Sequence, residues 1–444
     1  MSQEQTSKKK IGMTTWIMIG VVLGMIYGLL VPNVPVVTSV LKTVGQVFLR
    51  LIQMSIILLV MGQIIQAIGA LKMKEIGKIG YKTLIIFFCS SLLAAVFAVV
   101  FGYLLKPGTG VDMAAIQTTT TVEANQSTIF DTILNFFPSN IIKSMSDGST
   151  MQVIIFALFF GVAISMLNKN NDFKFFDIIK EFNQVILRIV TMIMKVAPFG
   201  VFALIASSIA SYGIKVVIPL AKYLGVFAII DLVFMIVYIL VVTLVTKVSP
   251  LDIIRGLGKM SMMAIATGSS AVTLPTAMQD VENKLGVGKK VSRIMMPLGV
   301  TLNSNGAAIH MVITLITIAQ MYGIAFNGSN ILYMVLLCTL ASVANAVVPG
   351  AGIVSLTIVV PQMGLPLESI ALFAGVEIFV GMLRTILNVD GDALSAMIVA
   401  KSENALNLDI VKRSRNMTED ELVELAAKEQ AEEDQAILES AKSA

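Results

Sequence analysis

Long uncharged hydrophobic segments alternate along this chain with short loops that carry most of its charges. A membrane-spanning helix needs about 20 mostly apolar residues, and most of these segments reach or approach that length. The pattern therefore predicts an all-α polytopic membrane protein. The segments that carry this prediction are 11–41, 51–71, 83–105, 151–167, 197–214 and 232–246.

Two further hydrophobic segments are interrupted at mid-length by small, polar and proline residues. The interruptions are Gly-Ser-Ser-Ala-Val-Thr-Leu-Pro at 268–275 and Ala-Asn-Ala-Val-Val-Pro-Gly-Ala-Gly at 344–352. Lipid offers no partner for free backbone groups, so unwound backbone at membrane depth persists only where protein or water satisfies it. Paired interruptions of this kind indicate the binding site of a membrane carrier.

Basic residues accumulate in the loops that face the cytoplasm. The lysines at 8–10 place the N-terminus there, and later groups lie at 72–82 and 169–180. Basic residues on both sides of the first interrupted segment indicate a re-entrant hairpin open to the cytoplasm, whereas uncharged flanks place the second on the opposite face. We expect a multi-pass protein of the cytoplasmic membrane of a prokaryote, with both termini inside.

The composition agrees with a membrane protein, because 56% of residues are apolar and only 14% are charged. The net charge of +4 reflects the basic cytoplasmic loops and gives no reason to expect a nucleic-acid partner. Cys89 and Cys338 lie in apolar segments, which favours a role in helix packing. From about residue 416 the chain becomes acidic, and we expect a solvated tail without chemistry.

Ionisable residues at membrane depth cost at least about 2.5 kcal/mol each on insertion scales, so each is a functional candidate. At helical spacing, Glu377, Arg384, Asn388 and Asp392 share one stripe of the segment 370–400, while Asp390 projects to another side.

Arg384 has no acidic residue one turn away on either side. Its guanidinium matches a carboxylate with two parallel hydrogen bonds, so one interpretation is a binding group for an anionic substrate. The other is a structural pair with Glu377 or Asp392. Asp392 with Asn388, Asn303 and free carbonyls offers oxygen ligands for a small cation, or else forms a salt bridge.

Three further features refine this picture. His310 is a candidate proton carrier, but we favour a satisfied packing residue. Asp231 is expected to stabilise a helix end or an interface, and Gly306 to permit local unwinding. The enzyme motifs His-Glu-x-x-His and Gly-x-Ser-x-Gly are absent from the sequence, so we do not expect an enzyme.

With these residues in view, the chain resembles the glutamate transporter family of cation-coupled dicarboxylate and acidic amino acid symporters from about residue 11 to 403. The rule about paired interruptions draws partly on this family, so the two arguments are not independent. The motifs that carry the resemblance are Ser269-Ser270 with Thr273-Leu-Pro275, Pro297-Leu-Gly299, Val-Pro-Gly-Ala-Gly at 348–352, and Arg384-Thr385 followed by Asn388, Gly391 and Asp392.

The resemblance implies eight transmembrane helices plus two inverted re-entrant hairpins, in a homotrimer whose transport half slides like an elevator. It divides the chain into a cytoplasmic N-terminus (1–10), scaffold and trimerisation helices (11–250), a transport core (251–403) and a cytoplasmic acidic tail (404–444). The helix at about 80–105 joins the transport half. The core contains hairpin 1, helix 7, hairpin 2 and helix 8 in that order.

The resemblance also implies site residues. The substrate would contact Ser269, Ser270, Val347, Pro349, Gly350, Arg384, Thr385 and Asn388. One cation site would use Gly299, Asn303, Asn388 and Asp392, a second Thr301, Ser342, Val343 and Asn345, and a third Ser90, Ser91, Asn303 and Asn305.

This chain departs from the family pattern at four positions, two of them among the residues just named. Asn305 replaces an aspartate, which should weaken or remove the third cation site, and Ala307 replaces a threonine. Gly381 replaces the aspartate that pairs with a substrate ammonium group, which favours an acid without an amino group. Val347 replaces a glycine in the outer hairpin and should reshape the gate.

These features predict a secondary active symporter that couples inward cation movement to uptake of a small anionic substrate, either a dicarboxylate or an acidic amino acid. Sodium is the expected coupling ion and protons are the alternative. A carrier of a neutral amino acid, a non-transporting sensor and an anion channel of the same fold stay open.

Overall fold

The computed structural model describes residues 13–31, 34–70, 73–110, 130, 134–168, 173–212, 217–343, 351–415, 417 and 421. Within these residues the protein is helical apart from one β-bridge between Val287 and Leu406, which confirms an all-α chain. The tip residues 344–350 and the segments 1–12 and 422–444 lie outside the described residues.

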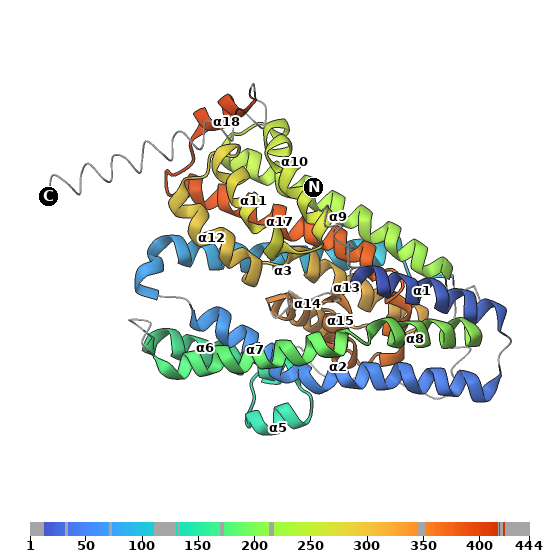
Figure 1. Cartoon of the computed structure of the whole chain (residues 1–444). Coiled ribbons are helices and arrows are strands. Elements are labelled where there is room, and N and C mark those ends of the chain that lie inside the picture. Colours follow the sequence, from blue (N-terminus) through green and yellow to red (C-terminus); the bar gives the residue numbers. More distant parts are fainter. Residues whose placement is uncertain are drawn as a thin grey trace, which may run out of the picture.

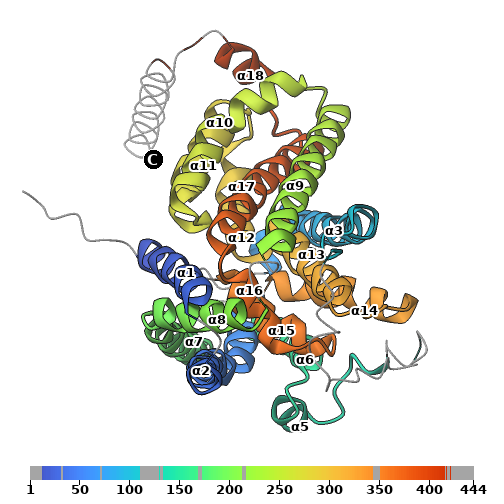
Figure 2. The same cartoon turned by 90° about the vertical axis from the view of Figure 1, so that its right-hand side faces the viewer.

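One group of helices is built from the first half of the chain and lies together on one side of the molecule (Figure 2). Its central member is the 35-residue helix α2, which packs against α6, α7 and α8. The group consists of α1 (Met13–Leu30), α2 (Pro35–Gly69), α6 (Thr150–Leu167), α7 (Lys174–Met194) and α8 (Ala197–Tyr212), with the short α5 (Ile141–Ser146) beside α6.

Glycines at four-residue spacing bring α1 unusually close to α8. A Cβ atom at Gly20 would lie 2.4 Å from the carbonyl oxygen of Pro198, and one at Gly24 would lie 2.9 Å from that of Phe202. Gly28 continues the same stripe one turn later. Small residues at this spacing let the backbones of two membrane helices approach each other.

The second half of the chain forms another group around α17, which packs against α9, α10, α12 and α13 (Figures 1 and 2). Helix α3, from the first half, packs against α13 and α14 in this group. The bounds are α3 (Met73–Leu105), α9 (Val217–Thr246), α10 (Pro250–Thr267), α11 (Ser270–Asn283), α12 (Lys289–Leu302), α13 (Asn305–Met321), α14 (Gly328–Val343), α15 (Ala351–Gln362), η2 (Leu367–Ser369), α16 (Ile370–Phe373), α17 (Glu377–Ser402) and α18 (Leu408–Ser414).

Both interrupted segments lie between helices that pack against each other. Helix α10 ends at Thr267 and is capped by Gly268, which adopts the left-handed conformation with φ of 58°, and Ser269 is the N-cap of α11. Glycine tolerates this conformation without strain. Helices α14 and α15 flank the second interruption and also contact each other.

The break in the span Lys289–Met321 occurs at Asn303 and Ser304. Asn303 is extended, with φ of −114° and ψ of 109°, whereas Gly306 lies inside the first turn of α13. The expected unwinding at Gly306 is therefore misplaced by two residues. Asparagine and serine favour such a break because their side chains compete for backbone hydrogen bonds.

Five helices are long and apolar enough to cross a membrane among the residues that the structure describes. A sixth span results if α7 and α8, which are bent by 52°, are counted as one. The five are Pro35–Gly69, Lys78–Leu105, Thr150–Leu167, Pro219–Thr246 and Lys289–Met321.

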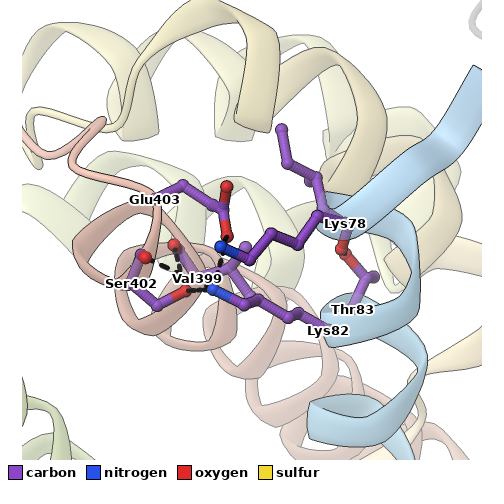
Figure 3. A network of polar contacts seen from close by, with 7 residues as sticks. Lys78, Lys82, Thr83, Val399, Ser402 and Glu403 are labelled. Carbon is purple, nitrogen blue, oxygen red and sulfur yellow. Dashed lines mark hydrogen bonds and ion pairs between the residues drawn. The ribbon is translucent and has the colours of Figure 1, made fainter.

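An ionic contact ties the start of α3 to the end of α17 (Figure 3). The ammonium group of Lys82 donates hydrogen bonds to the carboxylate of Glu403 and, at 2.8 Å, to the hydroxyl of Ser402. Lys78 lies 3.9 Å from the same carboxylate. The hydrogen bond from Lys82 lowers the pKa of Glu403 below its ordinary value.

The chain after α17 returns to the base of the first hairpin. The backbone N–H of Asn407 donates to the carbonyl of Gly286 at 2.7 Å, and the guanidinium of Arg415 pairs with the carboxylate of Asp252 in α10. The structured part of the chain thus extends beyond residue 404, at the proposed start of the tail.

Candidate substrate and cation site

Polar residues of the second helix group contact one another at the break between α12 and α13, which side chains of α3 and α17 also reach. Asn303 stands at the break, and its amide donates to the carboxylate of Asp392 at 2.7 Å. That carboxylate rests against Gly299, where a Cβ atom would lie 2.3 Å from the carboxyl carbon. Both Asn303 and Asp392 are buried, so the site places one acidic group beside unwound backbone.

Two serines of α3 complete this group of oxygens. The hydroxyl of Ser91 donates to Asn305 Oδ1 at 3.0 Å, and that of Ser90 lies 3.2 Å from the amide oxygens of both Asn303 and Asn305. Hydroxyl, amide and carboxylate oxygens are the ligands that hard cations prefer. Residues predicted for two different cation sites therefore lie in one contiguous cluster, which we call the oxygen cluster: Ser90, Ser91, Asn303, Asn305 and Asp392.

Asn388 fixes the start of α13 against α17. Its Oδ1 accepts a hydrogen bond of 2.8 Å from the backbone N–H of Gly306. A Cβ atom at Gly306 would lie 2.5 Å from the carbonyl oxygen of Arg384, so the two helices touch at backbone distance. The glycine is needed for this close approach, which the sequence did not indicate.

Arg384 forms an ion pair with Glu377, which is one of the two interpretations drawn from the sequence. Arg384 Nη2 lies 3.4 Å from Glu377 Oε1, and the same oxygen accepts a 2.9 Å hydrogen bond from the N–H of Gly352 in α15. Both charged side chains are buried, and Arg384 Nη1 has no hydrogen-bond partner among the described residues. Asp392 contacts Asn303 instead. Among the residues that the structure describes, the guanidinium is therefore only partly engaged.

His310 is buried, as a packing residue would be, but its hydrogen bonds are not satisfied. Neither ring nitrogen has a partner among the described residues, and Nε2 lies 4.0 Å from Glu377 Oε2. Its ring meets Phe227 edge-on, with the centroids 6.0 Å apart. Asp231 is also buried, has no hydrogen-bond partner among the described residues and lies in the middle of α9, so the helix end is excluded and the interface remains of its two expected places. That helix extends well beyond Asp231 on both sides.

Hydrogen bonds of serine and threonine hydroxyl groups stabilise the turn at the tip of the first hairpin. The carbonyl of Ser269 accepts from Thr273 Oγ1 at 2.9 Å and from Thr267 Oγ1 at 3.3 Å, and the hydroxyl of Ser269 accepts from the N–H of Val272. Ser270 begins α11 and is partly exposed. The tip is thus held in a turn that leaves the serine side chains near the surface of the hairpin.

The other predicted residues are not brought together by the described contacts. Thr385 and Ser342 are buried and donate to carbonyls of their own helices, those of Gly381 and Thr339, at 2.7 Å. Thr301 is exposed and Val343 ends α14. Four predicted residues lie outside the described residues, namely Asn345, Val347, Pro349 and Gly350.

Two contacts of α17 could not be found from sequence. Asp390 accepts a 2.8 Å hydrogen bond from Ser261 of α10, which confirms that it faces a different side from Asp392. The sequence showed Gly352 only as part of the motif at 348–352. Its backbone N–H donates to Glu377 because α15 packs against α17, which the sequence does not reveal.

Comparison with known proteins identifies the family to which this chain belongs. The family model described as "Sodium:dicarboxylate symporter family" matches residues 13–402. The chain belongs to this family. It is a multi-pass membrane transporter rather than an enzyme, and the family resemblance noted in the sequence is confirmed.

Curated relatives cover nearly the whole chain. A proton/sodium-glutamate symport protein of Geobacillus stearothermophilus is 32% identical over 409 residues, which are 90% of this chain and 96% of the relative. A proton/glutamate-aspartate symporter of Escherichia coli is 32% identical and covers 83% of this chain and 86% of its own. A C4-dicarboxylate transport protein of Deinococcus radiodurans is 29% identical, over 90% and 91% of the two chains.

Proposed function

We propose that this family member is a symporter that binds a small carboxylic acid at Arg384 together with a cation at the oxygen cluster. The observation that carries the proposal is the buried guanidinium, whose Nη1 lacks a hydrogen-bond partner among the described residues. A buried donor of this kind is costly unless a ligand engages it. One member of the oxygen cluster, Asp392, lies on the same helix as Arg384, about two turns further along.

The cation is proposed to be sodium. One carboxylate surrounded by neutral oxygens suits a monovalent hard cation. The amide of Asn305 supplies less charge than the aspartate of the family pattern, so we propose one or two coupled sodium ions and a weakened third site. The ligands include the backbone at Gly299, Thr301, Ser342, Val343 and Asn345 as the family resemblance implies.

The substrate is proposed to be a dicarboxylate, with acidic amino acids as the next candidates. The printed names of the relatives cover both classes. A Cβ atom at Gly381 would meet only Arg384 Nη2, at 3.8 Å, so this position supplies no acid for a substrate amine. Ser269, Ser270, Thr385, Asn388 and the tip residues Val347, Pro349 and Gly350 would surround the rest of the molecule.

Movement is proposed to follow an elevator mechanism in a homotrimer. The helix group of α1, α2, α7 and α8 would form the scaffold, and the group around α17 would slide with its load. Eight crossings with two inverted hairpins and cytoplasmic termini complete this proposal. The arrangement supports it, because the two helix groups lie on different sides of the molecule in Figure 2 and meet through α15 and α16, which contact α2 and α8.

The proposal is tested by uptake of radiolabelled succinate and L-glutamate into proteoliposomes with an inward sodium gradient. Wild-type protein should accumulate at least one of them, and Arg384→Ala should abolish the uptake. Because this change leaves Glu377 buried without its partner, a second variant with Arg384→Ala and Glu377→Gln removes both charges and controls for folding. Normal uptake by either variant would reject Arg384 as the binding group.

A neutral amino acid is the second candidate, because the pair with Glu377 already compensates the charge of Arg384. In that case alanine or serine would compete with succinate in the same assay, and Arg384→Ala would change folding more than specificity. The family and its named relatives weigh against this candidate.

A further inference from the structure

Asp231 of α9 is a buried acid that takes no part in the substrate and cation assignment above. The residue is 6% exposed, and neither of its carboxylate oxygens has a hydrogen-bond partner among the described residues. It lies in the middle of a helix that is long and apolar enough to cross a membrane. An ionisable residue at this depth is costly and indicates a functional role. The groups that surround Asp231 therefore matter for its assignment.

Helix α9 lies alongside α17, and two contacts fix the alignment of the pair (Figures 1 and 2). The ring of Tyr223 meets that of Phe373, which lies in α16 shortly before α17, with the centroids 4.8 Å apart. Further along both helices, the hydroxyl groups of Tyr238 and Ser395 lie 2.6 Å apart. The two helices therefore run in the same direction.

Asp231 and Arg384 lie at the same level of this helix pair. Asp231 stands near the middle between the two tyrosines of α9, and Arg384 stands midway between Phe373 and Ser395. At helical spacing Asp231 shares the face of Tyr238, and Arg384 shares the face of Ser395. The side chains of Asp231 and Arg384 accordingly lie within electrostatic range of each other.

Helix α13 gives an independent alignment. The hydroxyl of Tyr223 lies 2.9 Å from that of Thr314, and one turn later the ring of Phe227 meets that of His310, with the centroids 6.0 Å apart. Helices α9 and α13 therefore run in opposite directions. Asp231 follows one further turn along α9, which places it opposite the start of α13, beside the break in that span.

The backbone of Arg384 also lies at the start of α13. A Cβ atom at Gly306, in the first turn of α13, would lie 2.5 Å from the carbonyl oxygen of Arg384. One turn before Arg384, a Cβ atom at Gly381 would meet only Arg384 Nη2, at 3.8 Å, among the described residues. Asp231, the guanidinium and a position without a side chain therefore occur at one level of three helices.

Within the described part of the chain, the cations of these three helices leave Asp231 uncompensated. Arg384 pairs with Glu377. Lys222 of α9 and Lys401 of α17 are exposed, and α13 contains neither lysine nor arginine. One guanidinium thus stands against two buried carboxylates, which is unfavourable unless a further positive charge enters. A dicarboxylate adds only negative charge here, whereas an amino acid also brings an ammonium group.

We propose that Asp231 binds the ammonium group of an amino acid substrate whose carboxylate is held by Arg384. The inference rests on the proposed function, since it needs a carboxylate at the guanidinium, and it selects the acidic amino acid from the two candidate substrate classes. An ammonium group has three N–H donors, and the two oxygens of Asp231 accept only. The acid that is missing at Gly381 of α17 is thereby replaced by one from α9.

The ammonium group then contributes to affinity through hydrogen bonds between charged groups. Such bonds are worth about 1.5–3 kcal/mol, which corresponds to about tenfold to a hundredfold in affinity. A ligand that lacks the ammonium group also leaves Asp231 buried without a partner, which adds to the discrimination.

The test is isothermal titration calorimetry of the purified full-length protein at saturating sodium. The probes are L-aspartate with succinate and L-glutamate with glutarate, because the members of each pair differ only in the amino group. We expect wild type to bind at least one amino acid tenfold or more tightly than its matched diacid. Asp231→Asn, which keeps the size of the side chain, should weaken binding of that amino acid by tenfold or more and leave the diacid within about threefold of wild type.

Asp390→Asn is the matched control, since it removes another buried acid, one that accepts a hydrogen bond from Ser261 of α10. It should leave the ratio of the two affinities unchanged. The double variant with Asp231→Asn and Gly381→Asp moves the acid to α17, on the other side of the ligand, and should restore the preference for the amino acid. The comparison of the two ligands on wild type needs no variant, so the proposal stays testable if Asp231→Asn does not fold.

Equal affinity of wild type for both members of a pair would overturn the role of Asp231 and leave the function proposed for Arg384 standing. An equal loss of both ligands in Asp231→Asn would likewise overturn it, because a structural or cation-binding acid does not distinguish them. No binding of any of the four acids would overturn this inference together with the proposed function.

Discussion

Asp390 and Asp392 are separated by one residue on α17 but face different partners. Asp392 lies in the oxygen cluster against Asn303, whereas Asp390 accepts a hydrogen bond from Ser261 of α10. Helical geometry alone predicted this division. The two residues therefore allow the proposed cation ligand, Asp392, to be tested against another buried acid on the same helix.

Asp392→Asn should weaken sodium-dependent binding by about tenfold or more, because removal of even a supporting group commonly costs that much in metal affinity. The check is the sodium concentration needed for half-maximal substrate binding. Asp390→Asn is the control and should stay close to wild type. Equal effects of the two changes would mean that Asp392 has no special role with the cation.

The residue stripe on α17 could be predicted from the sequence because helical periodicity fixes which side chains share a face. The residues that these side chains contact could not be predicted. The spacing of Arg384 and Glu377 does not determine whether the arginine pairs with an acid of its own helix or binds a ligand. Gly352, which donates to Glu377, belongs to α15, and the sequence does not show that this helix packs against α17. Arg384 and Glu377 do pair, and within the described part of the chain Nη1 of the guanidinium has no hydrogen-bond partner.

At the scale of elements, the break between α12 and α13 depends on close contact with α17. Gly306→Ala would place a Cβ atom 2.5 Å from the carbonyl oxygen of Arg384, which is backbone and cannot move aside as a side chain could. We expect this overpacking to destabilise the protein by about 1–3 kcal/mol and to abolish substrate binding.

Gly258→Ala is the matched control, because a Cβ atom there meets nothing within 4 Å and the residue lies inside helix α10. Alanine favours helix over glycine, so this variant should unfold at an unchanged or higher temperature. Thermal unfolding in detergent, together with ligand binding, measures both. Full binding by Gly306→Ala would mean that the contact is not tight in solution.

The two interrupted segments could be predicted because polar and proline residues leave backbone groups without partners in lipid, which is unfavourable unless protein or water satisfies them. The position of the third break was not predictable to the residue. The break was predicted at Gly306 because glycine is flexible, but the helix is interrupted at Asn303 and Ser304. Gly306 instead allows α13 to approach α17 closely.

At the scale of the whole molecule, the Lys82–Glu403 contact joins α3 to the end of α17 (Figure 3). The pKa of Glu403 is lowered, so the contact contributes stability above the ordinary pKa of a glutamate and loses it as pH falls through the lowered value. Lys82→Met should therefore unfold at a lower temperature than wild type near pH 7, and the difference should disappear in acid.

The comparison is a set of unfolding curves between pH 3 and pH 8 for wild type, Lys82→Met and Glu403→Gln. High salt should reduce the difference, since the pair is close to solvent. A difference that stays constant across the pH range would show that Lys82 acts through packing alone.

The grouping of helices follows from the chain as a whole. The division into a scaffold and a transport half stays a prediction from the family resemblance, and the contacts show only that α3 packs against α13 and α14. The number of crossings, the proposed trimer and the proposed sliding motion depend on the bilayer and on other subunits, which the sequence of one chain does not encode directly.

The most direct test of the central claim is a thermal-shift titration of the purified protein with succinate, L-glutamate and L-alanine, each in sodium and in choline chloride. A ligand that binds the folded state raises the unfolding temperature. We predict stabilisation of wild type by an acid in sodium, a much smaller effect in choline, and none for Arg384→Ala with Glu377→Gln. Stabilisation of that double variant by the same acid, or of wild type by L-alanine alone, would contradict the account.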